Sequence, residues 1–261
     1  MAGDRYSSAV RRVTFEPDMR ALEPQLSEVV DAIADESTPL DTVAVLLQDA
    51  ARLATTTGCS GIRIEVEPVS DELDRICRDD GFELQRTMLQ LRRSLPLESR
   101  LRPDNDFVLE NLRPFRPGHD DQAWIAVNHQ AFAWHPEQGN WTLDDLAERL
   151  SESWFQSDGF LVLDDIIDGL PTGQLIGFCW AKIHYDIDPH LGEIFVIGVD
   201  PANQSRGMGR ALVWAGLNWL GHCGVTDAML YVEGDNESAL HVYRSLGFTP
   251  TAAHRWWYKA L

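Results

Sequence analysis

Short apolar stretches separated by turn-forming residues run through the second half of the chain. Residues 160–163 and 175–184 are two such stretches, and residues 168–173 between them carry the glycine, proline and aspartate typical of a turn. Residues 194–199 are apolar throughout, which is typical of a strand buried on both faces. The pattern therefore predicts a hairpin followed by a buried central strand.

Helical spacing of apolar residues follows this central strand. A helix is predicted from residue 208 to about residue 223. Its apolar face would be formed by Met208, Ala211, Leu212, Ala215 and Trp219. Two further helices are expected at 119–133 and 142–155, where Thr142 and Asp144 offer side-chain oxygens to the N-terminus of the second one.

The remaining elements of this half are shorter. The sequence predicts an opening strand at 106–116 and another strand at 228–232. Asn236 would cap a short helix that ends at Gly247, and residues 254–260 would close the sheet.

The first half of the chain repeats the back half of this layout. The predicted order is helix, strand, helix, strand, at 42–56, 61–66, 71–79 and 84–92. Gly81 and Phe82 repeat the ending formed by Gly247 and Phe248, but no glycine-bearing loop precedes them. The chain therefore looks like a broken duplication.

The expected domain division follows from this repeat. Residues 95–105 contain two prolines and several charges and read as a linker. We expect a truncated, non-catalytic half-domain at 1–98 and a complete catalytic domain at 106–261.

Composition narrows the class of protein. With 261 residues, 44% of them hydrophobic, the chain can build a packed core, and its formal charge of −19 disfavours nucleic acid and anionic lipid as partners. No apolar run reaches the roughly 18 residues of a membrane span, and the N-terminus lacks the apolar core of a signal peptide. The four cysteines show no metal-ligand spacing. We expect a cytoplasmic protein without a metal, and a monomer.

Residues 199–210, VDPANQSRGMGR, carry the strongest chemical signal. A strand, a short glycine-bearing loop and a helix together aim several backbone N–H groups at one anion. Gly207 and Gly209 would let a pyrophosphate lie against the backbone, and Arg206 and Arg210 add positive charge. The order of residues is neither that of a P-loop nor that of a dinucleotide-binding loop.

This loop resembles the acetyl-CoA loop of the GCN5-related N-acetyltransferases (GNAT), written Q/R-x-x-G-x-G/A after a V-x-P turn. The resemblance implies an α/β (α+β) fold with a mixed, mostly antiparallel central sheet flanked by helices, here preceded by a truncated half-copy of the same fold. It also implies acetyl-CoA as co-substrate. In that fold the central strand and its neighbour diverge, and the pantetheine arm pairs with the exposed strand, where Gly198 would leave room for the thioester.

Longer segments resemble the mycothiol synthases, actinobacterial enzymes that acetylate the cysteinyl amine of desacetylmycothiol. The similar segments are residues 128–142, 146–149, 154–159, 177–184, 191–201, 230–236 and 243–248. The family has two tandem acetyltransferase domains, of which the second is active. Its first domain is complete and contributes to the substrate pocket, whereas this chain carries only the back half of that domain.

The resemblance implies a role for each matching residue. Glu193 would be the general base, acting through water, and Tyr243 the general acid. Acetyl-CoA would be held by Ile197, Gly198, Val199, Gln204, Ser205, Arg206, Gly207, Met208, Gly209, Arg210, Asn236, Glu237, Ser238, Ala239, Leu240 and His241. The substrate would be contacted by Glu137, Lys182, Glu193 and Tyr231.

The residues themselves support this chemistry. Acetyl transfer from a thioester needs a deprotonated amine and a proton for the leaving thiolate. Glu193 could take the proton from the amine, and Tyr243 could give one to the thiolate. An α-amine with a pKa of about 7.7–8.0 is easier to deprotonate at neutral pH than a lysine at about 10.4. The charged side chains of Lys182, Glu137 and Glu193 also suit a substrate that is a hydroxyl-rich amine.

Two other functions fit the sequence. The acidic chain could acetylate another small cationic amine, such as an aminoglycoside or a polyamine. It could also be a non-catalytic acyl-CoA-binding regulator, although Glu193 and Tyr243 favour an enzyme.

Overall fold

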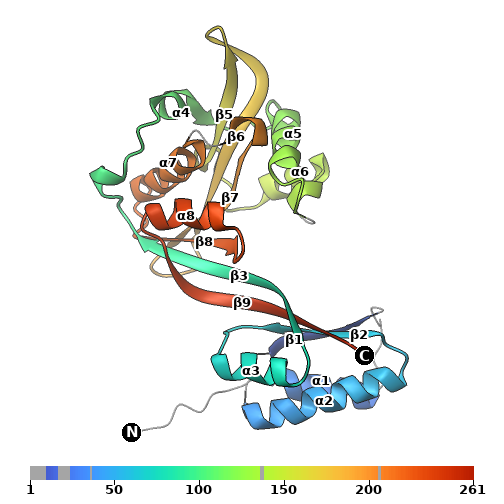
Figure 1. Ribbon diagram of the computed structural model, residues 1–261. Coiled ribbons are helices and arrows are strands. Elements are labelled where there is room, and N and C mark those ends of the chain that lie inside the picture. The colour runs from blue at the N-terminus through green and yellow to red at the C-terminus, as the bar shows by residue number, and fades with distance from the viewer. Residues whose placement is uncertain (1–9, 17–23, 36, 136–137, 205–206) are drawn as a thin grey trace. The chain divides into compact units, whose positions relative to one another are not determined.

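The computed structural model describes residues 10–16, 24–35, 37–135, 138–204 and 207–261 (Figure 1). The chain forms two compact units. The first contains residues up to Gln90 together with Val232–Asn236 and Pro250–Leu261, and the second contains Leu91–Tyr231 and Glu237–Thr249. The units therefore interleave along the sequence. The expected domains at 1–98 and 106–261 stay a prediction about function.

The first unit is a sheet covered by helices. Its strands are β1 (Val10–Glu16), β2 (Gly61–Val66), β9 (Thr249–Ala260) and β3 (Glu83–Ser94), in the order β1-β2-β9-β3. Its helices are α1 (Pro24–Ala34), α2 (Leu40–Thr56) and α3 (Asp71–Asp79). The four elements predicted at 42–56, 61–66, 71–79 and 84–92 are confirmed, whereas β1 and α1 were not predicted.

The last strand of the chain contributes to the core of the first unit. β9 pairs antiparallel with β2, and Trp257 lies opposite Ile64. The Trp257 side chain is 1% exposed and packs in one cluster with Ile62, Leu47 and Leu73. The strand predicted at 254–260 is therefore present, but it completes the sheet of the first unit.

The sheet of the second unit has the order β8-β7-β6-β5-β4. These strands are β4 (Leu112–Pro114), β5 (Phe160–Ile167), β6 (Leu170–His184), β7 (Leu191–Val199) and β8 (Asp227–Glu233). β4 to β7 pair antiparallel, and β7 pairs parallel with β8, so this sheet is mixed and mostly antiparallel as predicted.

Helices flank this sheet on both faces. They are α4 (Asp106–Asn111), α5 (Asp121–Ala131), α6 (Leu143–Ser151), α7 (Met208–His222) and α8 (Glu237–Ser245). Figure 1 shows α7 on one side of β5, β6 and β7, and α5 and α6 on the other. Short 3₁₀ turns lie at Ser99–Leu101, Gln138–Asn140, Ser157–Gly159 and Pro201–Asn203. Among the helices that the structure describes, none has both the length and the apolar character that a bilayer crossing requires.

The predicted opening strand at 106–116 is wrong over most of its length. Asn105 caps a helix there, because its side-chain oxygen accepts a hydrogen bond from the Val108 N–H at 3.2 Å. This cap makes residues 106–111 helical, and only Leu112–Pro114 pair as a strand. Three apolar residues in a row fit either element, and the cap decides between them.

The start of α6 is fixed by a capping box. The Thr142 side chain accepts from the Asp145 N–H, and the Asp145 carboxylate accepts from the Thr142 N–H at 2.7 Å. Thr142 is therefore the cap, as expected, with Asp145 rather than Asp144 as its partner. The helix ends at Ser151, four residues before the predicted end.

Aromatic side chains fill the space between the sheet and α5. Trp180 and Phe160 stack with ring centroids 4.1 Å apart, and Trp124 of α5 meets Trp180 edge to face at 6.0 Å. On the opposite face α7 approaches closely, because a Cβ on Gly216 would lie only 2.6 Å from the Cys179 sulfur. This packing fixes β6 and β7 between two rigid layers.

A buried aspartate holds the start of α5. Asp120 is 4% exposed and accepts hydrogen bonds from the Arg113 guanidinium at 2.6 and 3.1 Å and from the Arg116 backbone N–H at 2.8 Å. Burial alone would raise the pKa of Asp120, but these hydrogen bonds outweigh it and hold the pKa well below its usual range.

Asp120→Asn should therefore lower the free energy of unfolding at pH 7 by about 1–3 kcal/mol. The depressed pKa in the folded state means that this stabilisation is present above the unfolded carboxyl pKa of about 3.9 and is lost as the pH falls towards the folded value. Urea denaturation at pH 7 and pH 3 measures the effect, with the exposed Asp144→Asn as control. A difference from wild type that is as large at pH 3 as at pH 7 would contradict this role.

Candidate active site

β7 and β8 pair only at their beginnings. The parallel ladder joins Leu191 to Asp227, Gly192 to Ala228 and Glu193 to Met229, and it ends there. On its other side β7 stays paired with β6 up to Val199. The predicted divergence of the central strand from its neighbour is therefore present, and Glu193 lies where it begins.

Glu193 is a buried carboxylate with a histidine partner. Its residue is 8% exposed, and its Oε2 lies 2.7 Å from His184 Nε2 at the end of β6. An ionised carboxylate only accepts hydrogen bonds, so the imidazole donates from Nε2. No role was predicted for His184. Its spacing of two residues from Lys182 on a strand was the available signal, since such residues share a face.

Lys182 lies directly opposite Glu193 in the β6–β7 ladder. Its ammonium does not pair with that carboxylate among the described residues. It lies over the ring of Trp154 at 4.6 Å and over the ring of Phe195 at 5.7 Å. The aromatic rings thus hold a cation beside the candidate base. Its predicted contact with the substrate stays a prediction.

β7 has a bulge at Phe195, two residues after Glu193. Trp180 pairs with Val196 and Ala181 pairs with Ile194, so Phe195 is the extra residue between them. Phe195 contacts Trp154 and Trp180, on the same face as Lys182. Phe195 is two residues from Glu193 and shares its face by simple alternation, and the bulge puts Val196, the partner of Trp180, on the same face.

The described parts of the loop after β7 have the turn and the glycine that the sequence indicated. Asp200 accepts hydrogen bonds from the Ala202 N–H and the Asn203 side chain, both at 3.0 Å, and Pro201 begins a 3₁₀ turn. Gly207 is then the N-cap of α7, with a φ of +71° that favours glycine. A Cβ added to Gly207 or Gly209 would meet no atom of the described residues within 4 Å. The N-terminus of α7 is therefore open beside both glycines, which suits a pyrophosphate.

Gly209→Val should raise the KM for acetyl-CoA about 10-fold or more, because a branched side chain would occupy the open space beside the helix N-terminus. Gly209 lies inside α7 with no positive φ, so the substitution is compatible with the fold. Calorimetry measures the matching rise in the Kd of acetyl-CoA, with Gly221→Ala as a control for folding, because Gly221 has no positive φ and a Cβ there would approach only the Pro96 Cα, at 4.0 Å. Unchanged affinity in a folded Gly209→Val protein would exclude this loop as the phosphate site.

Other residues of the predicted loop are engaged with the protein. The Gln204 side chain donates to the Val199 carbonyl at 3.3 Å. The Arg210 guanidinium donates to the Leu101 carbonyl at 2.9 Å and to the Ser245 hydroxyl at 3.3 Å, so it is fixed beside the helix rather than extended into solvent. Met208 is buried. Ser205 and Arg206 lie outside the described residues.

The reason for a glycine at position 198 differs from the one expected. A Cβ there would lie 2.8 Å from the Phe178 ring and 2.9 Å from the Ala131 Cβ. The space beside Gly198 is thus taken by protein side chains and is not left for a thioester. The contacts of Ile197, Gly198 and Val199 with acetyl-CoA stay predictions, since they would use the backbone of β7.

Tyr243 lies on the buried side of α8. Its residue is 7% exposed, and its ring meets Phe248 edge to face at 5.9 Å. Burial raises the pKa of the Tyr243 hydroxyl, and the nearby Cys179 adds to the rise. Among the described residues this hydroxyl has no hydrogen-bond partner. Arg93 donates to the Leu246 carbonyl and holds the end of this helix.

The other residues predicted to contact acetyl-CoA or the substrate differ in their exposure to solvent. Leu240 is buried beside Tyr243 in α8, whereas Glu237, Ser238 and His241 are exposed, and Asn236 and Ala239 are half-buried. Tyr231 is 45% exposed and lies two residues beyond the end of the β7–β8 ladder. Glu137 lies outside the described residues. The contacts predicted for these residues therefore stay predictions.

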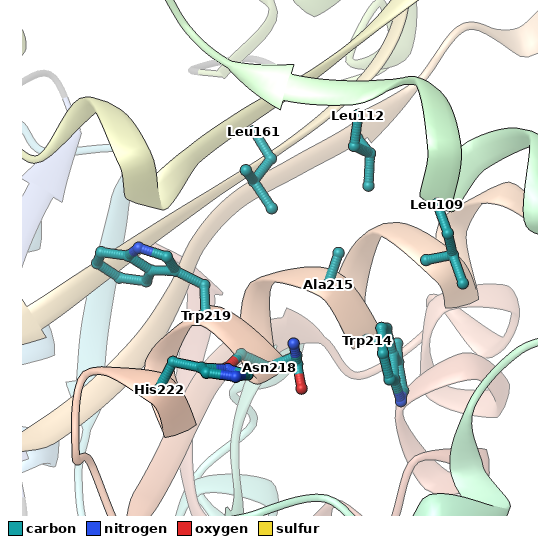
Figure 2. Close-up of a pocket in the computed structure, with 8 residues that line it drawn as sticks. All are labelled: Leu109, Leu112, Leu161, Trp214, Ala215, Asn218, Trp219 and His222. Atoms are coloured by element: carbon teal, nitrogen blue, oxygen red, sulfur yellow. The ribbon is translucent and has the colours of Figure 1, made fainter.

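A pocket of about 410 Å³ lies elsewhere on the second unit (Figure 2). It is lined by Leu109, Leu112, Leu161, Trp214, Ala215, Asn218, Trp219 and His222. Leu161 pairs with Cys179, which faces α7, whereas Glu193 shares a face with Lys182. The pocket is therefore on the other side of the sheet from the candidate base.

Comparison with known proteins finds similarity to acetyltransferases. Residues 126–248 match the model of the acetyltransferase (GNAT) family. A mycothiol acetyltransferase of Acidimicrobium ferrooxidans is 47% identical over 169 residues, which cover 64% of this chain and 52% of that protein. One of Thermobispora bispora is 40% identical over 198 residues, covering 74% of this chain and 64% of the relative. The chain thus spans between half and two thirds of the length of these curated relatives.

A solved structure supports the same fold. The GCN5-related N-acetyltransferase of Sphaerobacter thermophilus superposes with a TM-score of 0.59 at 19% identity, covering 85% of this chain and 66% of that one. The predicted GNAT fold is confirmed, and the matched residues include β7, α7 and α8. Residues 126–248 thus match the GNAT acetyltransferase family, and the chain is similar to the mycothiol acetyltransferases.

Proposed function

We propose that this protein is an acetyl-CoA-dependent N-acetyltransferase that acetylates the cysteinyl amine of desacetylmycothiol, giving mycothiol and CoA. The observation that carries the proposal is the end of the β7–β8 ladder at Glu193. It places a buried carboxylate at the mouth of the opening where an acyl-thioester arm would pair with β7. The similarity to the mycothiol acetyltransferases supports this choice of substrate.

The N-terminus of α7 suits the pyrophosphate of acetyl-CoA. The open space beside Gly207 and Gly209 lies at the N-terminus of a 15-residue helix, where the backbone dipole favours an anion. Arg210, fixed at the first turn, adds a positive charge. Bound acetyl-CoA would supply the activated acetyl group.

Glu193 and Tyr243 would carry out the proton transfers of the reaction. An ammonium must lose one proton before its nitrogen attacks the thioester carbonyl carbon, and the nitrogen loses a second proton as the amide forms and the C–S bond breaks. Glu193 would accept a proton from the amine, directly or through water, and Tyr243 would protonate the leaving sulfur. One proton leaves the site overall, and the buried carboxylate must release it to solvent after each turnover.

An amine panel tests the proposal. Purified protein is incubated with acetyl-CoA and desacetylmycothiol, cysteinyl-glucosamine, an aminoglycoside or spermidine, and CoA and the acetylated product are followed by chromatography and mass. Chromatography is needed because the substrate carries its own thiol. We expect the highest kcat/KM with desacetylmycothiol.

The other outcomes separate the alternatives. Faster turnover of the aminoglycoside or of spermidine would make the protein an acetyltransferase of another small cationic amine. Tight acetyl-CoA binding without CoA release on any amine would make it a non-catalytic acyl-CoA binder.

A further inference from the structure

We propose that His184 is a positioning residue that holds the Glu193 carboxylate through its Nε2 and leaves the second oxygen, Oε1, to take the proton from the substrate amine. The inference rests on the proposed function, because it assigns Glu193 as the base. It adds a residue to the candidate site beyond the loop after β7 and the candidate acid Tyr243 of α8. The carrying observation is the 2.7 Å contact between His184 Nε2 and Glu193 Oε2.

The register of the hairpin places His184 for this task. His184 is the last residue of β6 and lies opposite Leu191, whereas Lys182 lies opposite Glu193. Lys182 and His184 share a face because side chains alternate along a strand, so both flank the carboxylate. The Lys182 ammonium lies over the rings of Trp154 and Phe195, and the imidazole takes the carboxylate instead.

The His184 imidazole bonds only one of the two Glu193 carboxylate oxygens among the described residues. Within the described part of the chain, Oε2 of Glu193 has this one hydrogen bond and Oε1 has none. The side chains of His184 and Glu193 are 18% and 11% exposed, so few water molecules can compete for Oε2. The carboxylate is therefore oriented at the point where β7 and β8 separate.

Orientation of a base has a large effect on rate, because a displacement of about 1 Å can cost 10²-fold. A glutamate without a partner would sample several rotamers at this strand position. The hydrogen bond from His184 restricts that choice without consuming the oxygen that reacts. His184 need not exchange a proton with the substrate, and it acts only through Glu193.

The test compares two substitutions at this position. His184→Leu removes the donor, and we expect it to lower kcat about 10- to 100-fold while the KM for acetyl-CoA changes less than about 2-fold. His184→Gln places an amide N–H near the position of Nε2 and should recover most of the lost rate. His222→Leu is the matched control, because His222 is exposed on α7 and, within the described part of the chain, its side chain bonds only the Asn218 carbonyl of the same helix.

A double-substitution cycle separates positioning from general damage. If His184 acts through Glu193, His184→Leu should lower kcat by less than about 2-fold in a Glu193→Gln background. Circular dichroism and thermal melting confirm that each variant is folded. Wild-type kcat in His184→Leu, equal losses in the Leu and Gln variants, or the same loss in the Glu193→Gln background would each overturn the inference.

A second measurement keeps this inference separate from the proposed function. If the wild-type protein acetylates no amine, the proposed function fails and kinetics cannot test His184. The ¹⁵N resonance of His184 Nε2 then decides, because Glu193→Gln should shift it if the carboxylate is its partner. A resonance that Glu193→Gln leaves unchanged would overturn the pairing itself.

Discussion

Glu193→Gln should lower kcat about 10²- to 10⁴-fold, because it removes a positioned proton acceptor but keeps the shape of the side chain. The loss should be largest at low pH, where more of the amine is protonated and deprotonation depends most on the base. The KM for acetyl-CoA should change little, because the loop that begins after β7 and the N-terminus of α7 are untouched.

Initial rates with desacetylmycothiol from pH 6 to pH 9 measure this effect. Glu148→Gln is a suitable control, because Glu148 is exposed on α6. The amide oxygen that Glu193→Gln introduces can still accept a hydrogen bond from His184, so the variant should fold normally. Wild-type turnover across this pH range would show that Glu193 is not the base.

The central part of the site could be predicted from the sequence because its signals are local. An unbroken apolar run fixed β7, and the Val-Asp-Pro turn with two glycines fixed the loop and the start of α7. Each signal depends on residues within about ten positions of one another. The same holds for α2, β2 and α3, whose periodicity gave their bounds to within two residues.

Pairing between distant strands could not be predicted in this way. The residues of β9 read correctly as a strand, but alternation does not identify its partner. One of its two neighbours is β2, more than 180 residues away, and this pairing buries Trp257 beside Ile62 and Ile64. The strand predicted at 254–260 therefore lies in the sheet of the first unit, as part of β9.

The contact between His184 and Glu193 was missed for a related reason. Seeing it requires the register of the β6–β7 hairpin, and that register includes a bulge at Phe195. A shift of one residue would move either side chain to the opposite face. Sequence alone placed His184 at the end of one predicted strand and Glu193 just before the next, but it did not place them on one face.

Tyr243→Phe should lower kcat about 10²-fold, at the lower end for loss of a general acid, because a thiolate can leave without full protonation. The raised pKa keeps the hydroxyl protonated throughout the working pH range, so the loss should be nearly independent of pH below about pH 9. This behaviour separates it from Glu193→Gln, whose effect grows as the pH falls.

The same substitution should leave stability and acetyl-CoA binding almost unchanged. The Tyr243 hydroxyl has no hydrogen-bond partner among the described residues, and phenylalanine keeps the ring contact with Phe248. Tyr258→Phe is the matched control, because it removes a hydroxyl that bonds Glu16 in the first unit. Melting temperature, acetyl-CoA binding and pH–rate profiles of the two variants test the assignment. If Tyr243→Phe loses rate only because acetyl-CoA binds more weakly, Tyr243 is a binding residue, and another group must protonate the leaving sulfur.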